Sequence, residues 1–173
     1  AIVAEELNPY LLVVPECEEP GATTQSLGVK PLRSRHWIGD NSRKGLGVFS
    51  FGEYSFEIHP SYEPKHRWIL PVQVSGPFSF TLLAIWTIPH ADSGSYVQPL
   101  MEALETYTRL HDEATVVWAG DFNANFRFDT SARRPKFSDF VAALGQRDIH
   151  SLYHQERNCE HGNEEEKTFY MYH

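Results

Sequence analysis

Two apolar strands, a helix and a third apolar strand follow one another between residues 67 and 119, and this order restricts the fold more than any other feature. The strands RWILPVQV (67–74) and FSFTLLAIW (78–86) are separated by Ser75-Gly76-Pro77, a connection typical of a hairpin. The strand TVVWA (115–119) follows only after the helix, which predicts a crossover connection. Hairpins and helical crossovers in one chain predict an α/β sandwich with mixed sheets.

Two segments have helical periodicity. In SYVQPLMEALETYTRL (95–110), apolar residues recur every three or four positions, Ser95 is the expected N-cap and Pro99 lies in the first turn. KFSDFVAALG (136–145) is a shorter helix that we expect to end at Gly145. The residues expected to face the core are Val97, Leu100, Met101, Leu104, Tyr107, Leu110, Phe137, Phe140, Val141 and Leu144.

The remaining segments complete a single domain over residues 1–173, with no repeat or linker. Pro71 predicts an edge or bulged position for its strand. RHWIGDNSRKG (35–45) and NCEHGNEEEK (158–167) are polar enough to predict exposed loops. We expect Leu11–Val14, Leu82–Ile85 and Val116–Trp118 to be buried strands of one core. Further strands are expected at 45–50, 54–58 and 167–173, and a helix end at 1–7.

The composition is that of an ordinary globular protein, with 41% hydrophobic and 22% charged residues among 173. No apolar run is long enough to span a membrane. No signal-peptide pattern is visible either, although the chain begins at Ala1 rather than Met. The two observations slightly favour a cytoplasmic location. The net charge of −8 argues against a strongly electrostatic nucleic-acid binder but not against a nuclease. The spacing of Cys17 and Cys159 predicts no zinc site.

Carboxylates follow two of the apolar strands. Glu16 comes after Leu11–Val14, and Asp121 comes after Val116–Ala119. Because ligands of α/β sheets bind at the carboxyl ends of strands, both carboxylates can converge on one Mg²⁺ or Mn²⁺ ion. The alternative interpretation is that Glu16 begins a solvated acidic loop with Glu18 and Glu19.

The segment GDFN (120–123) is the more specific signal. Gly120 permits a tight turn, and in extended backbone Asp121 and Asn123 share one face while Phe122 turns into the core. An Asp orients or deprotonates water, and an Asn amide donates to a phosphate oxygen, so the pair suits the attack of water on a phosphoester. The alternative is an Asx-type turn in which both side chains satisfy backbone groups.

The motifs LLVVPECE, KGLGVFS, IWTIPH, VVWAGDFNAN and KTFYMYH, in this order, resemble the endonuclease/exonuclease/phosphatase superfamily over essentially the whole chain. This family includes deoxyribonuclease I and exonuclease III-type enzymes. The resemblance implies an incomplete four-layer sandwich of two mixed sheets flanked by helices. It also implies a Mg²⁺-dependent (or Mn²⁺-dependent) phosphodiester hydrolase that acts on nucleic acid or on a small or lipid phosphodiester. The oligomeric state is left open.

The resemblance also implies roles for individual residues. Glu16 matches the metal ligand, Asp121 the carboxylate that activates water and Asn123 the amide that stabilises the transition state. Thr87 stands near the family's phosphate-contacting His or Tyr, and His90 three residues later is the other candidate for that contact. The candidate substrate contacts are Lys44, Arg127 and Arg133.

Some parts of the family pattern have no match in this sequence. They are an Asn on an earlier strand, and an Asp and an Asp-His pair after residues 167–173. We therefore expect a domain cut at both ends, with little activity of its own. A non-catalytic binding module is the alternative function.

Overall fold

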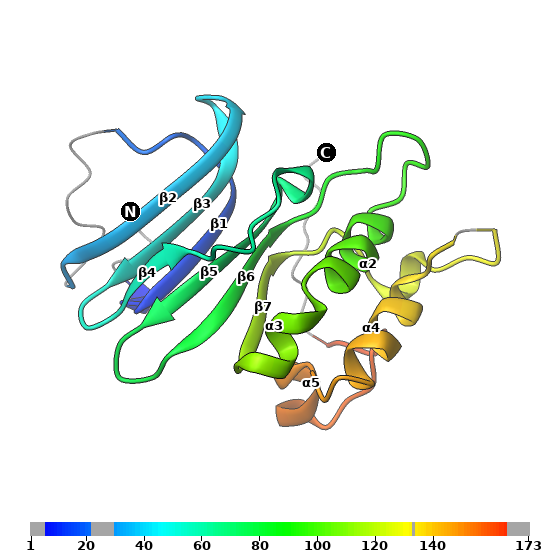
Figure 1. Cartoon of the computed structure of the whole chain (residues 1–173). Helices are drawn as coiled ribbons and strands as arrows, with labels where there is room; N and C mark the ends of the chain where they lie inside the picture. Colours follow the sequence, from blue (N-terminus) through cyan, green and yellow to red (C-terminus); the bar gives the residue numbers. More distant parts are fainter. Residues whose placement is uncertain (1–5, 22–29, 133, 166–173) are drawn as a thin grey trace.

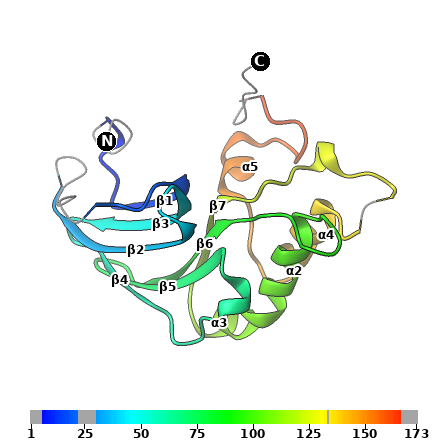
Figure 2. The same ribbon diagram turned by 90° about the horizontal axis from the view of Figure 1, so that it is seen from above.

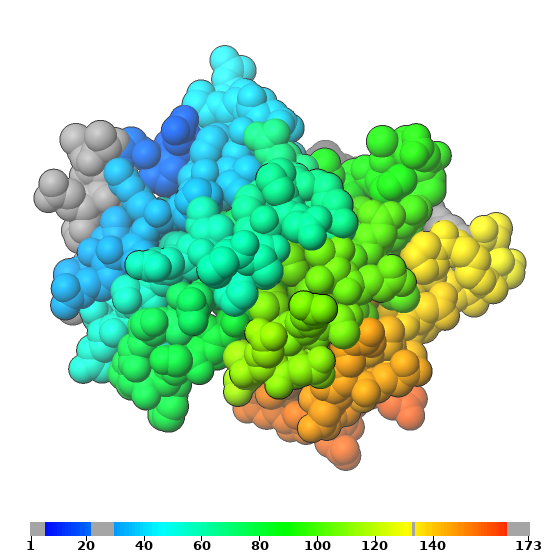
Figure 3. All heavy atoms as spheres, in the orientation of Figure 1, coloured from blue at the N-terminus to red at the C-terminus, as the bar shows by residue number. Residues whose placement is uncertain are grey.

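The computed structural model describes residues 6–21, 30–132 and 134–165. These residues form two β-sheets and four helices longer than one turn. Seen from above, the smaller sheet, the larger sheet and the helices lie side by side as three layers (Figures 1 and 2). The space-filling view shows the N-terminal strands (blue) on one side of the molecule and the C-terminal helices (orange) on the other (Figure 3). The predicted α/β fold with two sheets is therefore confirmed.

The smaller sheet has the order β1-β3-β2 and is antiparallel. Its strands are β1 (Leu11–Cys17), β2 (Leu32–Asn41) and β3 (Lys44–Phe51). The prediction of a loop over 35–45 is wrong, because β2 pairs with β3 along its length and the two join at a short turn. Polar residues are tolerated in β2 because alternate side chains, such as those of Arg33 and Arg35, are exposed.

The larger sheet has the order β4-β5-β6-β7 and is mixed. Its strands are β4 (Ser55–Ile58), β5 (Ile69–Ser75), β6 (Phe80–Trp86) and β7 (Val116–Asp121). β5 and β6 form the predicted hairpin, and β6 and β7 are parallel, as the helical crossover requires. The edge prediction for Pro71 is wrong, since β5 lies between β4 and β6. The β4 ladder ends opposite Val72, and just beyond it the His59 N–H donates to the Pro71 carbonyl at 2.9 Å.

The helices are α2 (Val97–Thr106), α3 (Thr108–Glu113), α4 (Phe137–Gly145) and α5 (Leu152–Arg157), with 3₁₀ turns at η1 (Pro64–His66) and η2 (Phe126–Phe128). The predicted helix 95–110 is divided at Tyr107, whose ψ of 16° ends α2. Tyr96, not Ser95, directly precedes α2, but the capping bonds come from Ser95, whose Oγ accepts the N–H groups of Val97 at 3.2 Å and Gln98 at 3.1 Å.

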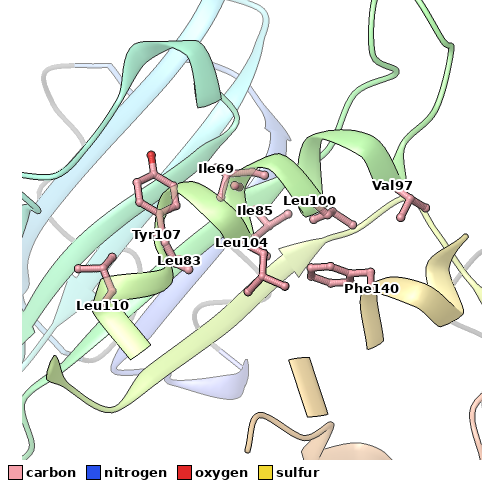
Figure 4. Packing of buried hydrophobic residues seen from close by; sticks show 10 residues of the cluster. Ile69, Leu83, Ile85, Val97, Leu100, Leu104, Tyr107, Leu110 and Phe140 are labelled. Carbon is pink, nitrogen blue, oxygen red and sulfur yellow. The ribbon is translucent and has the colours of Figure 1, made fainter. Parts of the chain in front are cut away.

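Two clusters of apolar side chains hold the layers together. One joins the larger sheet to α2, α3 and α4, and its members include Ile69, Leu83, Ile85, Leu100, Leu104, Tyr107 and Phe140 (Figure 4). The other lies between the two sheets, with Leu46, Val48, Leu70, Val72, Leu82 and Trp86 among its members. The burial predicted for Leu82–Ile85 is confirmed.

The prediction of full burial is wrong for the two other apolar strands. Leu11–Val14 is only partly buried, and Val117 is 38% exposed. Both strands lie at the edge of their sheets among the described residues, so neighbouring strands cover them on one side only. The strand predicted at 167–173 and most of the helix predicted at 1–7 fall outside the described residues.

Candidate functional site

Gly120 brings β7 unusually close to β6. Its φ is 139°, and an added Cβ would lie 2.8 Å from the carbonyl carbon and 2.9 Å from the nitrogen of Ile85. Only glycine fits at this approach. The parallel pairing continues to Asp121, which lies opposite Trp86 and whose backbone carbonyl accepts the N–H of Thr87 at 3.0 Å. The Asp121 carboxylate thus stands at the carboxyl end of β7, as predicted.

Asp121 and Asn123 form an Asx-type turn. Asp121 Oδ1 accepts the Asn123 N–H at 2.9 Å, and Asn123 adopts a left-handed φ of 47°. The expectation of an extended backbone here is wrong, because this hydrogen bond curls the chain back on itself. Asn123 Nδ2 also donates to the Thr87 carbonyl at 2.9 Å. Phe122 packs against the rings of Phe137 and Phe140, so its inward orientation is confirmed.

The turn leaves polar atoms for a ligand. An ionised carboxylate has two oxygens, and the Asx-type bond uses Oδ1 of Asp121. A carboxamide has two N–H groups, and the bond to the Thr87 carbonyl uses one of those of Asn123. Asp121 is partly buried and Asn123 is exposed. The turn therefore orients both groups and is compatible with ligand contact as well as with the Asx-type alternative.

Thr87 and His90 have positioning contacts. Thr87 is 1% exposed, and its hydroxyl donates to the Phe122 carbonyl, so in this structure it ties the GDFN segment to the end of β6. His90 accepts two backbone N–H groups: that of Asp92 at Nδ1 (3.3 Å) and that of Gly94 at the His90 carbonyl (2.8 Å). The Nε2 of His90 lies 3.8 Å from Glu102 Oε1. His90 thus organises the loop before α2.

Glu16 projects from an irregularity near the end of β1. The register of β1 against β3 shifts between Val14 and Cys17, and Glu16 has a left-handed φ of 56°. Its carboxylate pairs with Lys44, at 2.9 Å between Oε1 and Nζ. This ammonium shows that Glu16 lies where it can bind a positive charge. Left-handed backbone costs about 1 kcal/mol in a residue other than glycine, and such conformations cluster at functional sites.

Lys44 connects the end of β1 to the end of β6. Its Nζ lies 5.6 Å from the centre of the Trp86 ring as well as beside Glu16. Trp86 is the register partner of Asp121, and β1 contacts both β6 and β7. Glu16 and Asp121 therefore belong to different, facing sheets, and Lys44 links their strand ends through Trp86.

The other two candidate substrate contacts follow the GDFN segment. Arg127 is exposed, and its Nε donates to the Gly162 carbonyl at 3.0 Å. Arg133 falls outside the described residues. The same loop is tied to α4 by Asp129, whose carboxylate oxygens accept the N–H groups of Phe137 at 2.8 Å and Ser138 at 2.9 Å. Burial alone would raise the pKa of Asp129, but these amides lower it.

His154, His161 and Glu164 form a cluster that was not predicted from the sequence. His161 and Glu164 lie in the segment predicted to be an exposed loop, but both are partly buried. One signal was present, since His150 and His154 are four residues apart, a spacing of metal ligands on helices. In the structure, His150 pairs instead with Asp148 at 3.0 Å, and the ring that stacks on His154 is His161.

Comparison with protein-family models finds no match to this chain, and comparison with curated proteins finds none either. Within residues 6–21, 30–132 and 134–165, no helix combines the length and the apolar character needed to cross a membrane.

Proposed function

We propose that this chain carries the site of a Mg²⁺- or Mn²⁺-dependent phosphodiester hydrolase of the endonuclease/exonuclease/phosphatase superfamily. One observation carries the proposal. Two facing strands, β1 and β7, lead at the same end of the sandwich to carboxylates, and Lys44 spans the space between Glu16 and Trp86, the neighbour of Asp121. We expect the carboxylates of Glu16 and Asp121 to lie within about 10 Å of each other, close enough to share a hydrated ion.

The donor set fits a hard divalent cation. Mg²⁺ retains several waters and needs one or two carboxylates together with substrate phosphate oxygens. The cation would replace the Lys44 ammonium beside Glu16. When bound, it would polarise the phosphate and neutralise charge that develops in the transition state.

The chain's own groups would act on the nucleophile and on the phosphate. The free oxygen of Asp121 orients a water and takes its proton as the water oxygen bonds to phosphorus and the ester bond to the leaving oxygen breaks. The second N–H of Asn123 donates to a phosphate oxygen whose charge rises in the transition state. The Asx-type turn and the bond to Thr87 hold both groups before substrate arrives.

The alternative is a binding module without catalysis. Buried Thr87 stands where the family places a His or Tyr that contacts phosphate. This difference favours a fold that binds without turnover, so the test must separate cation binding from hydrolysis.

The test for cation binding uses paramagnetic Mn²⁺ and the amide NMR signals of the 173-residue chain. Mn²⁺ should broaden the signals of Glu16, Asp121 and Asn123 first, and Glu16→Gln should abolish this selectivity. Asp112→Asn, at an exposed position on α3, is the matched control and should change nothing. Broadening that spares Asp121 and Asn123 would contradict a shared cation site.

Turnover is measured on bis(p-nitrophenyl) phosphate with Mg²⁺, Mn²⁺ or EDTA. We expect little turnover by the 173-residue chain, because groups that act as a unit lose most of their effect when some are missing. In a protein that supplies the further Asn, Asp and His, Asp121→Asn should lower turnover at least about 100-fold. A binding module would bind the cation and show no metal-dependent turnover in either form.

A further inference from the structure

The cluster of His154, His161 and Glu164 holds three metal-binding side chains together. One ligand atom from each residue lies within 4.8 Å of the others, and all three residues are partly buried. His154 belongs to α5, and the other two follow it in the turn that leads back toward η2. These residues are distinct from Glu16, Asp121 and Asn123 and have no part in the proposed hydrolysis.

Neighbouring groups orient each member of the cluster. His154 Nδ1 lies 2.7 Å from Ser151 Oγ, and its Nε2 lies 3.1 Å from Glu164 Oε1. When the Nδ1–H of His154 donates to Ser151, its Nε2 carries a lone pair that can bind a metal, which is the usual arrangement of a metal-binding histidine. Glu164 Oε1 is also fixed, because it accepts the Gly162 N–H at 2.8 Å.

The ring of His161 is held between two other rings. It stacks on His154 at 3.7 Å and on Phe126 at 5.0 Å between centroids, with interplanar angles of 28° and 17°. The stack brings the two imidazoles face to face, and a nitrogen of each lies within 4.8 Å of the other and of a Glu164 oxygen. Phe126 belongs to η2, and the bond from Arg127 to the Gly162 carbonyl joins the same two segments.

The donor types and spacing agree with zinc. Two imidazole nitrogens and one carboxylate oxygen form a common zinc set, with a water as the fourth ligand. Bonds of about 2.0–2.1 Å in a tetrahedron place ligand atoms about 3.4 Å apart. The cluster, with its atoms within 4.8 Å, needs a contraction of no more than about 1.5 Å, which rotations about side-chain bonds supply. Mg²⁺ prefers an all-oxygen set and is not expected to compete.

We propose that His154, His161 and Glu164 form a Zn²⁺ site with one open position, and that the bound ion fastens α5 to the following turn, which contacts η2 through Phe126 and Arg127. Because η2 directly follows the GDFN segment, zinc would stiffen the loop that carries Arg127.

The experiment titrates metal-free protein with Co²⁺ as a spectroscopic probe and then displaces it with Zn²⁺. We expect the visible absorption bands of four-coordinate Co²⁺ at one equivalent, lost on addition of one equivalent of Zn²⁺. His161→Ala and Glu164→Gln should each weaken Zn²⁺ binding at least about tenfold, since each removes a ligand of the three. His150→Ala, an exposed histidine on the same segment, is the matched control and should bind like the wild type.

Imidazole ¹⁵N NMR of the wild-type protein keeps the test decisive if a variant fails to fold. One nitrogen of His154 and one of His161 should shift on addition of one equivalent of Zn²⁺, whereas Mg²⁺ should shift neither. Unchanged imidazole signals at saturating Zn²⁺, or equal affinity in wild type and His161→Ala, would overturn the proposal. Glu16→Gln should leave this site intact, so its outcome is separate from that of the proposed hydrolase site.

Discussion

Gly120→Ala is expected to destabilise the protein strongly and to displace the GDFN segment. The new Cβ would lie 2.8 Å from the carbonyl carbon of Ile85, whereas unstrained carbon atoms keep about 3.5 Å or more between them. The clash is with backbone, because Ile85 is part of β6, a buried central strand. The strand cannot move aside without disturbing both clusters of apolar side chains. The φ of 139° adds a second cost, because that conformation is open essentially to glycine alone.

The magnitude follows from these two costs. Overpacking a close contact costs about 1–3 kcal/mol, and a residue held in a sparsely populated backbone region costs about 1–3 kcal/mol more. Together they predict a loss of about 2–6 kcal/mol, a large part of the about 5–15 kcal/mol that stabilises a typical domain. For a chain of this size, a loss of 4 kcal/mol corresponds to a fall in Tm of roughly 8–16 °C.

Urea unfolding of both the wild type and Gly120→Ala measures the difference. Gly145→Ala is the matched control: an added Cβ meets nothing within 4 Å, and the residue lies in α4, where alanine should be neutral or stabilising by up to about 1 kcal/mol. A Gly120→Ala protein within 1 kcal/mol of wild type would refute the close approach of β7 to β6. It would also remove the physical basis for the position assigned to Asp121.

Two further predictions concern the core and the effect of pH. Phe140→Ala should lower the free energy of unfolding in urea by about 3–5 kcal/mol, because Phe140 is 0% exposed. Val117→Ala should lower it by less than about 1 kcal/mol, because Val117 is 38% exposed. Equal losses in the two variants would show that the cores are misassigned. Burial, with Lys65 nearby, lowers the pKa of His66 from 6.5, so the unfolded state binds more protons as the pH falls below 6.5. The free energy of unfolding should therefore fall between pH 7.5 and 5.5, more steeply in wild type than in His66→Gln, and parallel profiles would contradict this.

Much of the fold was predictable from the sequence because local rules specify it. The faces of α2 and α4 follow from helical periodicity, and the hairpin between β5 and β6 follows from Ser75-Gly76-Pro77. The polar end of β7 was also readable, since an apolar strand that stops at Gly120 leaves Asp121 at its carboxyl end. In each case neighbouring residues in the sequence are neighbours in space.

Partners distant in the sequence were decided by the tertiary structure. β2 is a strand despite its polar residues because β3 supplies its hydrogen bonds, and Val117 is exposed because β7 is an edge strand among the described residues. The left-handed conformation of Asn123 depends on the Asp121 carboxylate and on the Thr87 carbonyl, which β6 provides.

The same distinction applies to the two candidate metal sites. The sequence alone indicated Glu16 and Asp121 as candidate groups, since each follows an apolar strand, but Lys44 and Trp86 connect their strand ends only in the folded chain. The spacing of His150 and His154 pointed to only one member of the cluster of His154, His161 and Glu164, because a turn and a stack of rings bring its members together. A sequence specifies which groups are available, whereas packing between separated segments decides which of them meet.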